Sequence, residues 1–194
     1  SLGHSDATYE QTQQLLARDY IQNATHFSNG MRGIHHREPG MQVALLQSDC
    51  TIEMIADGLH VHPAMIKFLL EAVGEDRMIL ISDSMRAADL ADGIYDLGGQ
   101  QVRVENGVCT LVGKENLAGS TLNLNRARQN MKKWLHLSDI ALAKLTATNS
   151  AKRLGLDKRK GSVAIGKDAD FFVVDEKDEV LLTVSEGIII YQNK

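Results

Sequence analysis

The chain has 194 residues, enough to bury one sizeable core or one large and one small domain. Hydrophobic residues make up 43% and charged residues 24%, an ordinary composition for a globular protein. The net charge of -4 offers no basic surface to nucleic acid, and no apolar run reaches the roughly 18 residues of a membrane helix, so neither nucleic acid nor membrane is expected as a partner.

The two cysteines, Cys50 and Cys109, lie far apart and do not have the spacing of a metal site. A framework of disulfide bonds is therefore not indicated, and we expect the reducing environment of the cytoplasm. The first residues do not have the pattern of a signal peptide, and none is expected. The chain starts with a small step from apolar to polar residues, Ser1-Leu2-Gly3-His4, which is typical of the middle of a domain.

In chain order, the first 83 residues alternate apolar segments with helical patterns. Pro63 suits the first turn of a helix that Gly74 ends, and its apolar face is expected to consist of Met65, Ile66, Leu69 and Leu70. Residues 77–82 form an apolar run of strand length, typical of a strand buried on both faces of a parallel sheet. We expect helices over residues 9–19 and 63–73, a helix or core segment over 41–46, and strands over 51–56 and 77–82.

A polar residue ends each of four successive expected strands, and these residues are His4, His26, His60 and Asp83. They are 22, 34 and 23 residues apart, close to the length of one strand–helix unit. In a (β/α)8 barrel, catalytic residues lie at the C-terminal ends of successive strands. The sequence therefore predicts an α/β fold in which residues 1–160 form the last four βα units, the second half, of a TIM-type barrel.

The later residues predict additions to this barrel. Alternating residues with turn glycines, including the Asn106-Gly107 pair, indicate a β-hairpin insertion at about residues 92–113. Helices are expected over 121–134, 137–144 and 147–154, with Ser138-Asp139 as a cap of the second. Short apolar strands at 171–174, 180–184 and 187–191 predict that residues 161–194 form the C-terminal strands of a small β domain.

The strand-end residues are candidates for metal binding and catalysis. Neutral imidazole is the commonest nitrogen ligand of zinc and iron, which makes His4 and His26 candidate ligands. A lone histidine at a strand end is more often structural, but four polar strand-end residues in series favour a site. Asp83 is either the N-cap of the next segment or a general base and acid beside a metal-activated water. His60 is a ligand, a donor to a carbonyl, or a solvated residue.

The loop between residues 26 and 40 is a second candidate site. Arg37, Asn29 and the backbone at Gly30 suit an anion, because guanidinium matches phosphate in a bidentate manner and glycine lets an oxyanion approach the backbone. The alternative is a structural contact of Arg37, either with Glu38 or with the end of a helix. The side chains expected to be ordinary loop or surface charges are His35, His36, His62, His136, Arg32, Arg86 and Arg103.

Several segments follow one another in the order and spacing of N-acetylglucosamine-6-phosphate deacetylases, and the whole chain resembles that family. These segments are Gly3-His4-Ser5-Asp6-Ala7-Thr8, Thr25-His26, Asn29-Gly30-Met31, His36-Arg37-Glu38-Pro39-Gly40, Asp57-Gly58-Leu59-His60-Val61, Ser82-Asp83-Ser84-Met85 and Leu117-Ala118-Gly119-Ser120. The tail resembles the amidohydrolase superfamily at large, in Thr148-Asn149-Ser150-Ala151, Leu154-Gly155-Leu156, Gly161-Ser162-Val163 and Gly166-Lys167-Asp168-Ala169-Asp170.

The resemblance implies a metal-dependent amidohydrolase, with a TIM barrel and a small β-sandwich, that hydrolyses N-acetyl-D-glucosamine 6-phosphate to D-glucosamine 6-phosphate and acetate. It implies that His4 and His26 bind a divalent ion, zinc or iron, that Asp83 is the catalytic acid and base, and that His60 contacts the amide carbonyl. The substrate-binding residues implied are Asn29, Gly30, Arg37, Asp57, Gly58, Leu59, His60, Leu117, Ala118 and Gly119. Family members are typically homodimers, in which the arginine can serve the neighbouring subunit.

The chain also departs from the family pattern. The loop 27–30 lacks the usual aromatic residue directly before asparagine and the alanine after it, and Ser-Asp-Ser-Met replaces the commoner Thr-Asp-Ala-Met. No residue matches the family's metal-binding glutamate, and two histidines are a thin metal site. Two alternatives stay open: another amidohydrolase such as a cyclic amidase, which should lack the Arg-Glu-Pro-Gly loop at 37–40, or an inactive folded fragment or interaction module.

Overall fold

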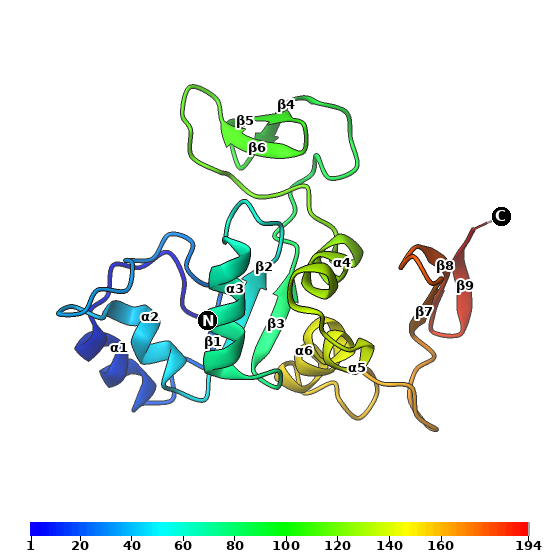
Figure 1. The fold of residues 1–194 in the computed structure, drawn as a ribbon, viewed down its shortest axis with the longest axis horizontal. Helices are drawn as coiled ribbons and strands as arrows, with labels where there is room; N and C mark the ends of the chain where they lie inside the picture. The colour runs from blue at the N-terminus through cyan, green and yellow to red at the C-terminus, as the bar shows by residue number, and fades with distance from the viewer. Residues whose placement is uncertain (194) are drawn as a thin grey trace.

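The computed structural model describes residues 1–193, and a parallel sheet lies at its centre (Figure 1). The strand order is β1 (Asn23–Ala24), β2 (Thr51–Ile55) and β3 (Met78–Ile81), with neighbours parallel. Leu2 extends the sheet beyond β1, because it forms a parallel bridge with Ala24. Four consecutive segments therefore lie side by side with their C-terminal ends at one edge, and the predicted α/β class is confirmed. The half-barrel and the domain boundary at residue 160 stay predictions.

Three helices connect these strands: α1 (Tyr9–Leu16), α2 (Gly40–Leu46) and α3 (Pro63–Val73). A capping box between Thr8 and Gln11 starts α1, which ends before the predicted Asp19 because the chain turns to a φ of 55° there. Pro63 opens α3 as expected. The predicted apolar face of α3 was wrong at Met65, which is 43% exposed.

The main core lies between the parallel sheet and its helices. Ile52 and Met54 point to the same face of β2 because side chains alternate along a strand, and both are fully buried in one core cluster with Ile66 and Leu69 of α3. Leu145, from a helical segment later in the chain, belongs to the same cluster. Each such buried side chain contributes roughly 1.5–3 kcal/mol, which fixes the strand ends that carry the polar residues.

A small antiparallel sheet follows β3 and stands above the parallel sheet in Figure 1. It consists of β4 (Gly93–Leu97), β5 (Gln100–Glu105) and β6 (Val108–Leu111). The insertion predicted as a hairpin is thus three-stranded, with one turn at Gly98-Gly99 and another at Asn106-Gly107. Asn106 and Gly107 have φ of 51° and 78°, the left-handed values that a tight hairpin turn needs.

Helical segments cover the other flank of the parallel sheet: α4 (Leu124–Leu135), α5 (Asp139–Ala143), the π-helical turn η1 (Lys144–Thr148) and α6 (Asn149–Arg153). Ser138 caps α5 as predicted. The two predicted helices 137–144 and 147–154 are joined by η1 into one continuous helical run. Buried Asn149 donates to the carbonyls of Glu75 and Met78, at 2.7 and 2.8 Å, which ties this run to the start of β3.

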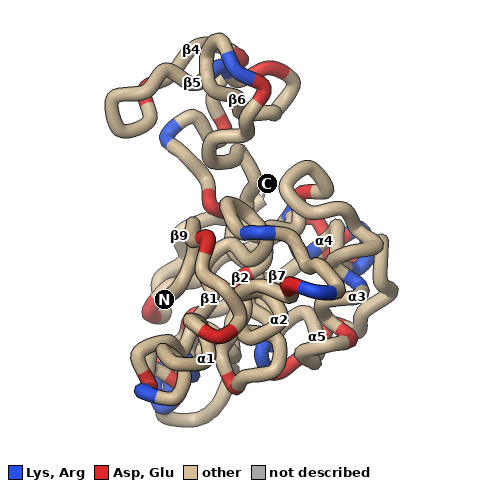
Figure 2. The backbone as a smooth tube through the Cα atoms, turned by 90° about the vertical axis from the view of Figure 1, so that its left-hand side faces the viewer, with Lys and Arg blue, Asp and Glu red and all other residues tan. Residues whose placement is uncertain are grey.

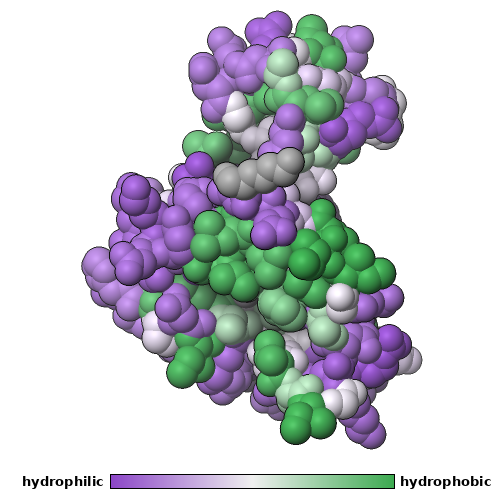
Figure 3. All heavy atoms as spheres, turned by 90° about the vertical axis from the view of Figure 1, so that its right-hand side faces the viewer, coloured by the Kyte–Doolittle hydropathy of each residue, from purple (hydrophilic) through white to green (hydrophobic). Residues whose placement is uncertain are grey.

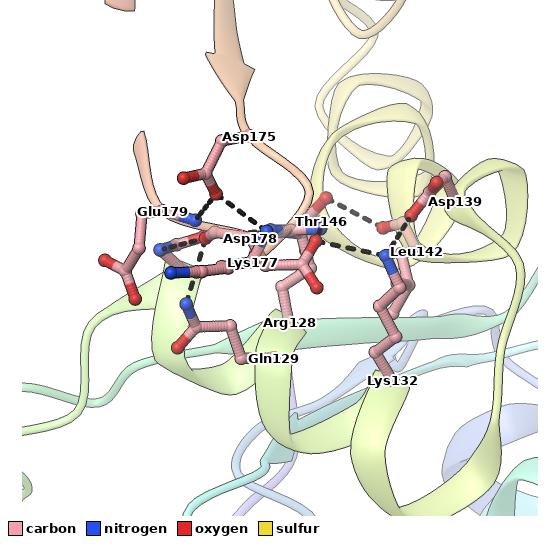
Figure 4. A network of polar contacts seen from close by, with 11 residues as sticks. Arg128, Gln129, Lys132, Asp139, Leu142, Thr146, Asp175, Lys177, Asp178 and Glu179 are labelled. Carbon is pink, nitrogen blue, oxygen red and sulfur yellow. Dashed lines mark hydrogen bonds and ion pairs between the residues drawn. The ribbon is translucent and has the colours of Figure 1, made fainter. Parts of the chain in front are cut away.

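A third sheet ends the described chain, with antiparallel strands β7 (Phe171–Val174), β8 (Val180–Ser185) and β9 (Ile188–Gln192). Its strands match the predicted positions within two residues. Apolar side chains on it are open to solvent, among them Ile188 at 67% and Ile190 at 64% exposure, and Figure 3 shows apolar residues gathered on this side of the molecule. Figure 4 shows the β7–β8 turn held on α4 by polar contacts around Asp178.

Charged residues of both signs are interspersed along the backbone in Figure 2, as the small net charge suggests. Over residues 1–193 the longest helix is α4, with 12 residues, and none of the described helices has the length and apolar character for a membrane crossing.

Candidate functional site

Polar residues follow each strand of the parallel sheet at the same interval. His4, His26, Asp57 and Asp83 each come two residues after the last strand residue, which is Leu2, Ala24, Ile55 or Ile81. Because neighbouring parallel strands share an edge, the four turns lie in a row at the C-terminal edge of the sheet. The sequence placed His60 in this row, whereas the structure gives that position to Asp57, with His60 three residues further on.

Three of these residues have an unusual backbone. The φ angles of His4, His26 and Asp83 are 45°, 33° and 49°, in the left-handed region that side chains other than glycine rarely adopt. Such a conformation costs on the order of 1–3 kcal/mol and persists only where the surroundings enforce it. The same strained turn at three strand ends points to a functional edge.

His4 and His26 lie together, with ring centroids 4.6 Å apart in an edge-to-face arrangement. Each ring also packs on a glycine. A Cβ at Gly30 would lie 2.5 Å from His4 Nδ1, and a Cβ at Gly3 would lie 3.1 Å from His26 Cε1. The close approach of the two imidazoles therefore depends on these two glycines.

Asp57 and His60 form a hydrogen-bonded pair, with 2.6 Å between Asp57 Oδ2 and His60 Nδ1. Burial opposes ionisation of Asp57, but hydrogen bonds from the His60 side chain and from the backbone N–H groups of His60 and Leu59 outweigh it, so the pKa of Asp57 is lowered. An ionised carboxylate only accepts, so His60 must donate from Nδ1. Asp57 thus fixes the orientation and tautomer of the His60 ring.

A cavity of about 480 Å³ lies beside this pair and brings it together with the predicted loop residues Leu117 and Gly119. Several residues to which the sequence analysis gave no role at the site also line it: Asn106, Gly107, Cys109, Ser120, Thr121, Leu122, Asn123, Arg126 and Asn130. They come from the β5–β6 turn, β6, the following segment and α4, and only tertiary packing unites them.

Asn130 supports the turn after β2 from α4, because its amide donates to the Ala56 carbonyl at 2.8 Å. The ring of Trp134 lies 3.2 Å from where a Gly58 Cβ would stand, so Gly58 lets α4 approach closely. Burial, and then the charge of Asp57, raise the pKa of the Cys109 thiol, which disfavours its reactive thiolate form.

Asp83 is exposed at the end of β3 and lines a separate cavity of about 470 Å³. The sequence left two roles open for Asp83, either the N-cap of a following helix or a general base and acid. Its carbonyl accepts a hydrogen bond from the backbone N–H of Ser120, at 3.0 Å. No described helix begins at Ser84, so the alternative role of Asp83 as a helix N-cap is wrong.

The loop 27–39 carries the predicted anion site. The Asn29 side-chain amide donates to the carbonyls of His26 and Phe27, at 3.1 and 3.3 Å, so it is engaged within the loop. Arg37 Nη1 lies 2.8 Å from His36 Nε2, and within residues 1–193 it forms no ion pair. The alternative ion pair between Arg37 and Glu38 is therefore wrong, because Glu38 pairs with Arg32 instead, and the alternative contact of Arg37 with a helix end stays a prediction.

Arg32, predicted as an ordinary surface charge, anchors this loop. It donates to both carboxylate oxygens of Asp6, at 3.0 and 2.9 Å, and lies 3.5 Å from Glu38. These contacts tie the loop to the turn before α1. Spacing could not reveal them, because Asp6 and Arg32 are 26 residues apart.

The pair His4 and His26 fits part of the ligand set of a divalent ion. His26 Nδ1 is buried and has no hydrogen-bond partner among the described residues, so the protein itself leaves this ring nitrogen unpaired. Within residues 1–193, however, no group of three or more His, Cys, Asp or Glu residues is arranged to hold a metal. An ion bound by the two imidazoles needs further ligands.

The sequence profile described as "Amidohydrolase family" matches residues 1–190. The chain is 42% identical, over its whole length, to N-acetylglucosamine-6-phosphate deacetylase of Bacillus subtilis, of which it covers 49%. The crystal structure of N-acetylglucosamine-6-phosphate deacetylase from Thermotoga maritima superposes with a TM-score of 0.94 at 37% identity, covering all of this chain and 53% of that one.

A second solved structure is similar, that of a variant of N-acetyl-D-glucosamine-6-phosphate deacetylase from Mycobacterium smegmatis in complex with N-acetyl-D-glucosamine-6-phosphate. Its TM-score is 0.91 at 35% identity, over 96% of this chain and 50% of that one. The chain thus spans about half the length of each of these three relatives.

Proposed function

Because the chain belongs to the amidohydrolase family, we propose that the protein hydrolyses N-acetyl-D-glucosamine 6-phosphate to D-glucosamine 6-phosphate and acetate. The observation that carries this proposal is the row of His4, His26, Asp57 with its partner His60, and Asp83 at one sheet edge. An amide is a poor electrophile, so its hydrolysis needs an activated water, a donor at the carbonyl and an acid for the amine. The row offers a residue for each task.

In this proposal His60 donates to the carbonyl oxygen of the acetyl group. Its Nδ1 proton is committed to Asp57, so donation from Nε2 requires the imidazolium form, whose charge the Asp57 carboxylate balances. A donor aimed at the developing oxyanion typically stabilises the transition state by about 3–4 kcal/mol.

Asp83 acts as the acid and base. Its carboxylate takes a proton from the attacking water and later delivers that proton to the amine of the leaving sugar. Its exposed position at a cavity supports this role, because water and substrate can both reach it.

His4 and His26 hold a divalent ion, zinc or iron, together with ligands beyond this pair. Such an ion, when bound, lowers the pKa of water toward neutrality and polarises a carbonyl. The unpartnered Nδ1 of His26 and the edge-to-face rings support a pair of nitrogen ligands.

The loop 27–39 binds the phosphate. Arg37 supplies the guanidinium, and the backbone of Gly30 supplies a second polar contact to the phosphate. Asn29, Asp57, Gly58, Leu59 and the segment Leu117–Gly119 complete the contacts to the sugar. Residues 32–38 are all exposed, which supports a homodimer in which Arg37 reaches the site of the neighbouring protomer.

We also propose that residues 1–160 are the second half of a TIM-type barrel and residues 161–193 the last strands of a β-sandwich, while residue 194 of the predicted domain lies outside the described residues. The parallel order of the first sheet and the similarity to the Thermotoga maritima enzyme support this division. The cytoplasm is the proposed location, and the two free cysteines agree with it.

Acetate release from N-acetyl-D-glucosamine 6-phosphate tests the function. The assay uses added zinc or iron, this chain, and a longer protein in which the first half of the Bacillus subtilis relative precedes Ser1. We expect turnover in the longer protein, and no turnover there would overturn the assignment. Asp83→Asn should abolish turnover, because the amide can neither take nor deliver the proton, while bound metal stays unchanged. Loss of metal in that variant would instead make Asp83 chiefly a ligand.

A further inference from the structure

Ser120 lies directly against the strand end that carries Asp83. Its backbone N–H donates to the Asp83 carbonyl at 3.0 Å, and its carbonyl accepts from the Met85 N–H at 2.9 Å. These two bonds form a parallel bridge between Ser84 and Ser120. The segment before α4 therefore holds the chain on both sides of Ser84, directly after Asp83.

The Ser120 hydroxyl adds a third tie. It donates to the Ser82 carbonyl, one residue before Asp83, and accepts from the Leu122 N–H at 3.1 Å. The residue is only 4% exposed. The hydroxyl is thus occupied within the protein, and its contacts are structural ones that reach the residue next to Asp83.

Asp83 needs such support because its φ is 49°, in the left-handed region. Gly119 allows the segment before α4 to approach Asp83 and Met85 closely. Its φ is 63°, and a Cβ there would lie 3.3 Å from Met85 Cβ and 3.6 Å from the Asp83 carbonyl oxygen. The segment that contains Gly119 and Ser120 therefore maintains the left-handed backbone of Asp83, which is unfavourable by itself.

We infer that Ser120 is a positioning residue that fixes the Asp83 carboxylate for proton transfer, an inference that rests on the proposed deacetylase function. Ser120 touches neither reacting atoms nor metal ligands, and it acts through the backbone of Ser82 and Asp83. Proton transfer demands placement within a fraction of an ångström, so loosening this segment should slow the chemical step more than it weakens substrate binding.

The test compares Ser120→Ala, Ser120→Thr and Ser84→Ala in the longer protein. Ser120→Ala should lower kcat roughly 10- to 100-fold with KM unchanged. Ser120→Thr keeps the hydroxyl and should recover most of kcat, which a purely packing role would not predict. Ser84→Ala is the matched control, because Ser84 directly follows Asp83, but among the described residues its hydroxyl forms a hydrogen bond with the Ser82 hydroxyl alone, at 3.1 Å.

Amide hydrogen exchange at Met85 gives a readout that needs no activity. Exchange should be faster in Ser120→Ala than in the unaltered protein and unchanged in Ser84→Ala. A kcat loss in Ser120→Ala no larger than in Ser84→Ala, or unchanged exchange at Met85, would overturn the inference. If the unaltered longer protein releases no acetate, the proposed function fails, and exchange at Met85 alone still decides whether Ser120 holds the Asp83 turn.

Discussion

At the residue scale, the site depends on Gly30 as much as on the histidines. A Cβ at this position would lie 2.5 Å from His4 Nδ1, and the φ of 61° disfavours any L side chain. Gly30→Ala should therefore displace the His4 ring and weaken divalent metal binding about 10-fold or more. Metal retained after dialysis, measured by elemental analysis, checks this expectation.

Gly33→Ala is the control for that substitution. It lies in the same loop, but a Cβ there would meet nothing within 4 Å. Metal retention in Gly33→Ala should match that of the unaltered protein. Equal retention in both variants would show that the His4 ring does not depend on the space above Gly30.

The Asp57–His60 pair gives a second prediction at this scale. In Asp57→Asn the residue keeps its shape but loses the charge that orients and balances the His60 ring. We expect kcat for deacetylation to fall about 100-fold, the typical cost of a lost oxyanion donor. Steady-state kinetics measure this fall, and His62→Asn, which alters an exposed histidine that caps α3, should leave kcat near its original value.

At the scale of elements, one buried side chain holds the first part of the loop 27–39. Gln42 of α2 is 5% exposed, accepts from the Ser28 hydroxyl at 3.1 Å and donates to the Arg32 carbonyl at 2.9 Å. Arg37 lies beyond these two bonds, in the exposed part of the loop. This amide therefore helps to set the path of the loop that leads to the proposed phosphate anchor.

Gln42→Leu should release the loop, because an apolar side chain can bridge neither group. We expect KM for the phosphorylated substrate to rise about 10-fold with kcat nearly unchanged, since the loss concerns binding in ground state and transition state alike. The same kinetics on Gln47→Leu, which removes only a contact with the Tyr9 hydroxyl at the end of α2, provide the comparison. A fall in kcat with constant KM would contradict the expectation.

Local patterns in the sequence were enough to predict most elements. The apolar run of β3, Pro63 and Gly74 around α3, and the Asn106-Gly107 turn are set by short-range chemistry, and the structure confirms them. Other features depend on contacts between distant residues. The bond from Ser120 to Asp83, the Arg32–Asp6 pair and the π-helical turn that joins α5 to α6 arise only from packing in three dimensions.

The sequence predicted that a series of polar residues follows the strands, but it did not place each residue correctly. The sequence marked His60 as the strand end, whereas β2 stops at Ile55 and Asp57 takes that place. The first residues after a strand carry no periodic pattern, so the exact turn could not be found from spacing. The bond between Asp57 and His60 then explains why both residues belong to one site.

At the scale of the whole molecule, the β7–β8 turn is joined to α4 by Asp178 (Figure 4). Its carboxylate contacts Arg128 at 2.9 Å and Lys132 at 3.1 Å, and its carbonyl accepts from Gln129 at 2.9 Å. The side chain of Arg128 is only 6% exposed, so its charge depends on this partner. The third sheet is thereby fixed on the helix whose residues also line the cavity beside His60.

Asp178→Asn should lower the free energy of unfolding by about 1–3 kcal/mol, because Arg128 would keep a buried charge without a countercharge. Urea denaturation of the longer protein measures the change. Glu176→Gln removes a charge from the same turn at an exposed residue and should leave the midpoint unchanged. Equal midpoints for Asp178→Asn and the unaltered protein would contradict the expectation.

The same pair makes stability depend on pH. Burial opposes ionisation of Asp178, but hydrogen bonds and charges from Lys132 and Arg128 outweigh it, so its pKa lies below the usual 3.8. A lowered pKa stabilises the fold above pH 3.8, and that stabilisation is lost as the pH falls through the folded-state value. The difference in unfolding free energy between the unaltered protein and Asp178→Asn should thus be constant near neutrality and shrink below about pH 4.

The left-handed backbone at His4, His26 and Asp83 limits what engineering can place there. Asparagine, aspartate, histidine and glycine tolerate this conformation, whereas valine, isoleucine and threonine clash with it. A library that seeks a new metal preference or a new reaction at this edge should therefore sample the tolerant residues at these three positions. A wider choice of amino acids is better introduced at neighbouring positions with ordinary φ angles, where the backbone does not restrict the side chain.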